Sequence, residues 1–127
     1  FSFDGTTWLK PGSYCFHPAE TVHGFRSTID GEAWFISRCS RELDFNFIEH
    51  PEKNYPYSLS KDPPHRPISV LPEPGTHQGW EKVHNNSGDV VLKRLILNQD
   101  LQTGEGSMLV QFLPGWESPH GDHFITR

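Results

Sequence analysis

The middle of the chain is rich in proline, and this feature constrains the fold more than any other. Proline lacks the amide hydrogen that helices and central strands need, and its ring fixes the backbone. Residues 51–75 therefore exclude both a long helix and a central strand, and we interpret them as a connector. The segment contains Pro51, Pro56, Pro63, Pro64, Pro67, Pro72 and Pro74.

The blocks on either side of the connector carry short apolar runs that are typical of β-strands. Turn residues such as Pro11-Gly12 and Asp30-Gly31 separate these runs, and almost no helix is expected. This spacing predicts an antiparallel sandwich or barrel, with the tryptophans and phenylalanines filling its interior. The strand-like runs lie at residues 1–3, 8–9, 14–16, 33–36, 45–47, 79–83, 89–98, 107–113 and 120–126.

Composition excludes two classes of partner. Charged residues make up 21% of the chain, the formal net charge is −5, and the basic residues are scattered, which argues against a surface that follows nucleic-acid phosphates. No apolar run approaches the roughly 20 residues that a membrane helix needs.

Two cysteines, Cys15 and Cys39, are too few for a disulfide framework. We therefore expect reduced thiols and a cytoplasmic protein.

One segment near the start combines a glycine, a proline and a histidine at a spacing that suits a metal ligand. Gly12 turns the chain into a strand, and Pro18 ends that strand. A short turn through Glu20 then lets the chain re-enter with His23 directed into the mouth of a barrel, where an imidazole can bind a divalent metal. His23 is the first candidate ligand, and we interpret the preceding His17 as a packed or hydrogen-bonded histidine.

This pattern resembles the second conserved motif of the cupin superfamily. Gly12, Pro18 and His23 fall on the glycine, proline and histidine of that motif. Glu20 stands where the family usually has a glycine, and Ser27 where it often has an asparagine. The resemblance implies an all-β protein, an antiparallel cupin-type β-barrel or jelly roll.

The end of the chain resembles the start of the first cupin motif, which in that family supplies two histidines and a glutamate as the other metal ligands. His123 fits the second histidine, and Gly121 stands where the first is expected. His120 could replace the first histidine only if a β-bulge turned both rings the same way. The glutamate would be expected just after Arg127. The resemblance thus implies a metal site built from His23, His123 and His120.

The two motifs stand in reversed order along the chain. This order resembles the inner portion of a bicupin, with the C-terminal half of one barrel at residues 1–50, the connector at 51–75, and the N-terminal half of the next barrel at 76–127. The alternative is that the halves close into one permuted barrel, alone or by strand exchange with a second copy. Only in that alternative could His23 and His123 converge on one metal. We expect a homo-oligomer.

The resemblance leaves two kinds of function open. One is a mononuclear metal-dependent oxygenase or isomerase acting on a small organic molecule, with one divalent ion that could equally be iron, zinc, nickel or manganese. The other is a non-catalytic cupin that senses or binds a metal or small ligand, because a site with fewer than three protein ligands is weak. The sequence holds no nucleophile elbow, phosphate-binding glycine loop or Cys-His spacing suited to a nucleophile.

Overall fold

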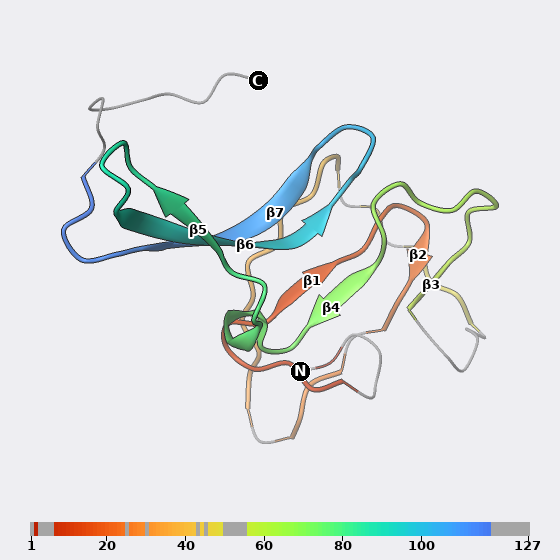
Figure 1. Cartoon of the computed structure of the whole chain (residues 1–127). Helices are drawn as coiled ribbons and strands as arrows, with labels where there is room; N and C mark the ends of the chain where they lie inside the picture. Colours follow the sequence, from red (N-terminus) through yellow and green to blue (C-terminus); the bar gives the residue numbers. More distant parts are fainter. Residues whose placement is uncertain are drawn as a thin grey trace.

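In a computed structural model of the chain, the regular secondary structure of the described residues is almost all antiparallel β-strand (Figure 1). It describes residues 2, 7–24, 26–29, 31–42, 44, 46–49 and 56–117. Within these residues the only helix is one 3-10 turn, η1, at Pro74–Thr76. The prediction of an all-β, antiparallel protein with almost no helix is confirmed.

Two small sheets join the first block of the chain to the proline-rich segment. Strand β1 (Tyr14–Phe16) pairs with β4 (Ser69–Leu71), and β2 (Thr21–Val22) pairs with β3 (Tyr57–Ser58), both antiparallel. Each sheet has only two strands, so β3 and β4 lie at edges, as the proline density requires. The proline-rich segment therefore supplies pairing partners in addition to connecting the two blocks.

The third sheet has three strands in the order β5 (Glu81–His84), β6 (Val90–Gln99) and β7 (Gly106–Phe112). Turn chemistry explains its two hairpins. The Asn85 side chain accepts backbone hydrogen bonds from Ser87 and Asp89, and the Asp100 side chain accepts them from Gln102 and Thr103. Gly104, with φ at 76°, takes the left-handed conformation in the second hairpin.

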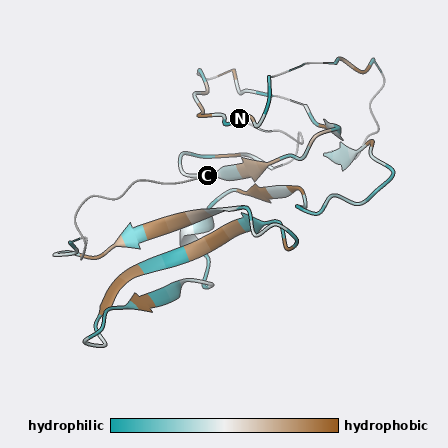
Figure 2. Cartoon of the chain, turned by 90° about the horizontal axis from the view of Figure 1, so that it is seen from above, coloured by the Kyte–Doolittle hydropathy of each residue, from teal (hydrophilic) through white to brown (hydrophobic). Residues whose placement is uncertain are grey.

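The core lies where the three-stranded sheet meets the β1/β4 pair, and Figure 2 shows these two layers side by side from above. Leu95 and Asn98 of β6 are buried there, with 6% and 7% of their surface exposed. The register β6 to β7 places Leu95 opposite Leu109 and Asn98 opposite Ser107, so all four side chains share the inner face.

Arg66 connects the two layers at this core. Its guanidinium donates to the Oδ1 atom of Asn98 on β6, to the Oγ of Ser107 on β7 at 2.7 Å, and to the hydroxyl of Tyr14 on β1 at 3.3 Å. It also lies 3.8 Å from the centre of the Phe16 ring, a cation–π contact. One side chain therefore links β1, β6 and β7.

Several expectations are not met in the described part of the chain. The strands there form three separate sheets and no closed barrel, so the jelly roll stays a prediction. The runs at 8–9 and 33–36 are not strands. An interior position is wrong for Trp8 and Trp34, which are 49% and 90% exposed. The physical reason is that no strand pairs with these runs, so nothing covers their side chains.

The Arg66 contacts yield a stability prediction. Replacing Arg66 by lysine keeps the positive charge but removes the fork that reaches three partners, so we expect the free energy of unfolding to fall by about 2 to 3 kcal/mol in a urea titration. The matched control is Arg94→Lys, because Arg94 forms an exposed ion pair with Glu81 at 2.7 Å; there the loss should be at most about 0.5 kcal/mol. Equal losses in the two variants would contradict the role of Arg66.

Candidate functional site

The candidate site is the turn that joins β1 to β2, with His17 at its start and His23 at its end. Gly12, with φ at 88°, takes the left-handed conformation before β1, as predicted for a glycine that turns the chain into a strand. After β1 the chain passes through His17 and Pro18 into a two-residue turn. The hydroxyl of Thr21 donates to the carbonyl of Pro18 at 2.7 Å and closes this turn.

Glu20 occupies the most constrained position of the turn. Its φ is 61°, which makes it the only non-glycine residue with positive φ in the described part of the chain. Glycine adopts this conformation at no steric cost, which is the physical reason why a motif of this shape favours glycine there. Glu20 is exposed, and its carbonyl accepts a hydrogen bond from the amide of Leu59 at 2.8 Å. The interpretation of Glu20 as a turn residue is confirmed.

The turn brings the rings of His17 and His23 together. Their centroids lie 4.4 Å apart, and the ring planes differ by 14°, so the two imidazoles stack. Both side chains are half-buried, and Nε2 of His17 and Nδ1 of His23 are out of contact with solvent. His17 thus packs against the predicted ligand, on the opposite face of β1 from Tyr14 and Phe16.

Burial controls the charge of this histidine pair. Desolvation, and then the charge of the neighbouring His23, lower the pKa of His17 from its ordinary value of 6.5 to about 4. Burial also lowers the pKa of His23. Both rings are therefore neutral at pH 7, and a neutral imidazole has the lone pair that a metal ligand needs.

The geometry of the stack separates the roles of the two rings. The lone pair of an imidazole lies in the ring plane, so two nearly parallel stacked rings do not direct their lone pairs at one point. His23 can act as a ligand with His17 packed against it, whereas joint ligation of one ion would require one ring to rotate. In the described residues, no group of three or more histidine, cysteine or acidic side chains is placed to hold a metal ion.

The other predicted ligands, His120 and His123, lie outside the described residues, as does His50. His65, His77 and His84 are exposed. Cys15 is half-buried and Cys39 is exposed, and neither forms a disulfide. His17 was not a predicted ligand. The sequence signal that could have placed His17 next to His23 is that the two histidines stand on either side of one short turn, which begins at Pro18.

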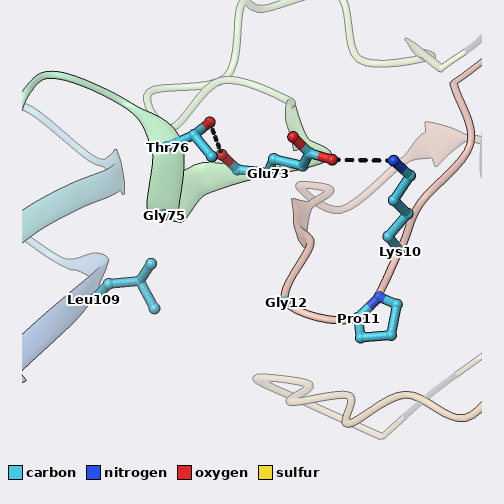
Figure 3. A pocket seen from close by; sticks show the side chains of 7 residues that line it. All are labelled: Lys10, Pro11, Gly12, Glu73, Gly75, Thr76 and Leu109. Atoms are coloured by element: carbon cyan, nitrogen blue, oxygen red, sulfur yellow. Dashed lines mark hydrogen bonds and ion pairs between the residues drawn. The ribbon is translucent and has the colours of Figure 1, made fainter.

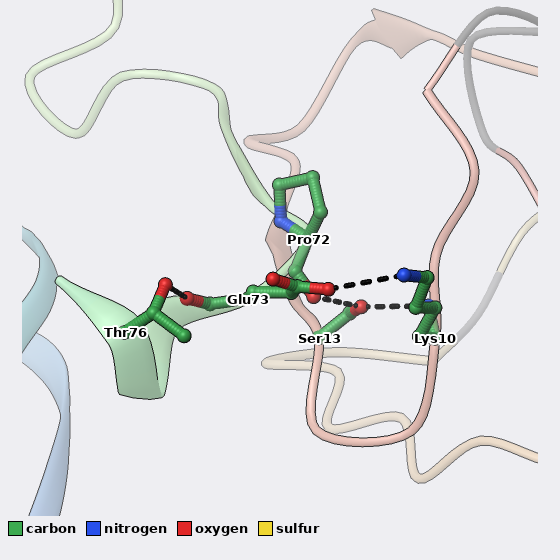
Figure 4. A network of polar contacts seen from close by, with 5 residues as sticks. All are labelled: Lys10, Ser13, Pro72, Glu73 and Thr76. Atoms are coloured by element: carbon green, nitrogen blue, oxygen red, sulfur yellow. Dashed lines mark hydrogen bonds and ion pairs between the residues drawn. The ribbon is translucent and has the colours of Figure 1, made fainter.

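Two surface hollows lie away from the histidine pair. The first, of about 450 Å³, is lined by residues that include Lys10, Gly12, Glu73 and Leu109 (Figure 3). Its two charged side chains pair with each other, Lys10 Nζ to Glu73 Oε1 at 3.2 Å (Figure 4). The second, of about 590 Å³, includes His84, Trp116 and Glu117 in its lining. Neither hollow includes His23.

Comparison with models of protein families, with curated proteins and with solved structures found no match to this chain. The likeness to cupins therefore depends on the motif residues alone. Among the described residues, no helix has the length and apolar character that crossing a membrane requires.

The lowered pKa of His17 predicts that the metal-free protein is destabilised by acid. Between pH 6.5 and about 4 the unfolded chain binds a proton at this position that the folded chain does not, so the free energy of unfolding falls as the pH falls through this window. Urea titrations in the presence of a chelator should show a weaker pH dependence for His17→Gln. The exposed His84→Gln serves as control and should keep the dependence of the original chain. An unchanged dependence in His17→Gln would contradict the prediction.

Proposed function

We propose that this chain is a metal-binding protein of the cupin type, with His23 as a ligand of one divalent ion. The observation that carries the proposal is the turn between β1 and β2, which presents a half-buried, neutral imidazole at the position where the cupin motif has its histidine. Imidazole nitrogen suits iron, zinc and nickel to similar degrees, so the donor does not select one of these three.

The donor chemistry of the turn fits such an ion. A metal competes with protons for an imidazole, and the lowered pKa of His23 removes that competition at pH 7. The stacked ring of His17 restricts the orientations of His23, which reduces the entropy that ligation would cost. His120 and His123 are proposed as the remaining histidine ligands on the motif resemblance alone, and this proposal requires the two halves to close into one permuted barrel, alone or with a second copy.

The activity proposed for such a site is that of a mononuclear metal-dependent oxygenase or isomerase acting on a small organic molecule. The ion, when bound, would act as a Lewis acid or as the centre that binds oxygen. Within this chain, the role of His23 is to hold the ion, and the role of His17 is to fix the His23 ring and to keep water from one side of it. His17 is thus a positioning residue.

A second candidate is a non-catalytic cupin that senses or binds a metal or a small ligand. It is favoured by the small number of donors, because the described residues contain no cluster of three or more potential ligands. A site with two protein ligands binds metal weakly and exchanges it readily, which suits reversible sensing better than catalysis. The two candidates differ in the number of ligands that the bound ion has.

Metal content of the purified protein tests the proposal. We expect stoichiometric divalent metal in the original chain, measured by elemental mass spectrometry after exchange into metal-free buffer, and at least a tenfold loss in His23→Ala. His84→Ala is the matched control, because His84 is exposed and lies outside the motif. It should keep its metal.

The metal content of the original chain and of its variants distinguishes three outcomes. Loss of metal in His23→Ala with a retained far-ultraviolet circular dichroism spectrum would support ligation by His23. Absence of metal from the original chain, even after addition of each of the four candidate ions, would exclude the proposal for this chain. Metal that survives His23→Ala would assign it to other residues.

A further inference from the structure

Strand β7 lies at the edge of the three-stranded sheet, and no other described strand pairs with its outer side. It has seven residues and pairs only with β6 among the described strands. The amide of Leu113 donates to the carbonyl of Val91 at 3.3 Å, which fixes the hydrogen-bonding phase of the pair. In an antiparallel ladder the hydrogen-bonded pairs alternate, so the N–H and C=O groups of Met108, Val110 and Phe112 point away from β6. Such an edge is a template for another strand.

The side chains along this edge are apolar and about half exposed, and the Phe112 ring also contacts Trp116, with 4.4 Å between the ring centroids. Met108, Val110 and Phe112 share one face of β7, and they are 53%, 42% and 56% exposed. Ile96, opposite Met108 on β6, is 43% exposed on the same face. The edge therefore offers both backbone groups and an apolar surface beside them. This is the combination that strand addition uses for affinity and for specificity.

The described part of the chain also contains a strand-prone segment that forms no strand. Residues 32–37, with the sequence Glu-Ala-Trp-Phe-Ile-Ser, favour a strand, yet residues 31–42 contain none and all are exposed. Trp34 is 90% exposed and Ile36 is 101% exposed. In an extended conformation these two side chains lie on one face of the segment. Two large apolar side chains in water on a β-prone segment are an unsatisfied pairing surface.

The two features are complementary in a second copy of the chain. We propose that residues 32–37 of one copy add as an extra strand to the free edge of β7 in another copy, and that the second copy does the same in return. Trp34 and Ile36 then extend the apolar face formed by Met108, Val110 and Phe112. The result is a closed, two-fold symmetric homodimer in which both exposed surfaces are covered.

The area involved is that of a stable complex. Trp34 and Ile36 each remove on the order of 150 Å² from water, and they cover a similar area of β7. Two such contacts in the dimer bury on the order of 1,200 Å², which lies at the lower end of the range of specific protein interfaces. One contact alone would fall below that range, so reciprocal addition is the stable form.

Two variants test the two halves of the contact separately. Val110→Pro removes an amide that points to the free edge and leaves the pairing with β6 intact. The double variant Trp34→Ser/Ile36→Ser removes the apolar side chains of the segment, which are exposed in the single chain and so cannot be needed for its fold. The control is Ile29→Ser, because Ile29 is also 101% exposed but lies outside both surfaces.

The measurement is the mass in solution, by sedimentation and light scattering across a wide range of concentration. We expect the original chain and Ile29→Ser to have twice the chain mass of 14.5 kDa, and each test variant alone to have the mass of one chain. An equal mixture of the two test variants should recover a dimer at high concentration, because the intact segment of one fits the intact edge of the other.

The alternatives give different results. A monomeric original chain would overturn the proposal, including the case in which residues 32–37 pair with the β7 edge of their own chain. A dimer that persists in both test variants would assign the interface to another surface. A dimer in the mixture would support the proposal, because no other interface predicts recovery. If Val110→Pro does not fold, the double variant alone still decides, since its monomer fold is unaffected.

Discussion

The rest of the fold depends on the hydrogen bonds that the Arg66 guanidinium donates. The guanidinium lies between the three-stranded sheet and the β1/β4 pair, and each of its hydrogen-bond acceptors is a neutral hydroxyl or amide. Among the described residues, Leu95 is the only hydrophobic side chain that is fully in the core. The cohesion of the two layers therefore comes less from apolar burial than from one polar side chain with fixed geometry. The partners of Arg66 therefore matter together, because a half-buried donor that loses its acceptor gives up the hydrogen bond while it stays partly shielded from water.

The part of the fold that could be predicted from the sequence is the part determined by local chemistry. Strands β5, β6 and β7 follow from short apolar runs rich in β-prone residues and from the turns at Asn85 and Asp100, whose side chains bind the backbone a few residues away. The pairing of β1 with β4 could not be predicted in this way. Strand β4 has three residues inside a proline-rich segment, and nothing in so short a run specifies a partner far along the chain. The run at 33–36 shows the converse, since strand propensity without a partner does not form a strand.

The same distinction between features set by local sequence and features set by distant contacts applies to the candidate site. The positions of Gly12, Pro18 and His23 define a local turn, and the structure contains that turn. The stacking of His17 on His23 could not be predicted, because it depends on the left-handed conformation of Glu20, which the side chain does not favour. Ligation by His120 and His123 remains a prediction, since both lie outside the described residues.

The partners of β1 and β2 have a consequence for the order of folding. Strands β3 and β4, which pair with the strands on either side of the histidine turn, come from a segment far along the chain, so this support for the turn forms only after a long loop has closed. The hairpins of β5, β6 and β7 need only local contacts and can form first. The stacked imidazoles are then among the last features to assemble and among the first to be lost when the protein opens locally. A ligand that binds the two imidazoles would therefore stabilise the part of the chain that folds last, after the three-stranded sheet has formed.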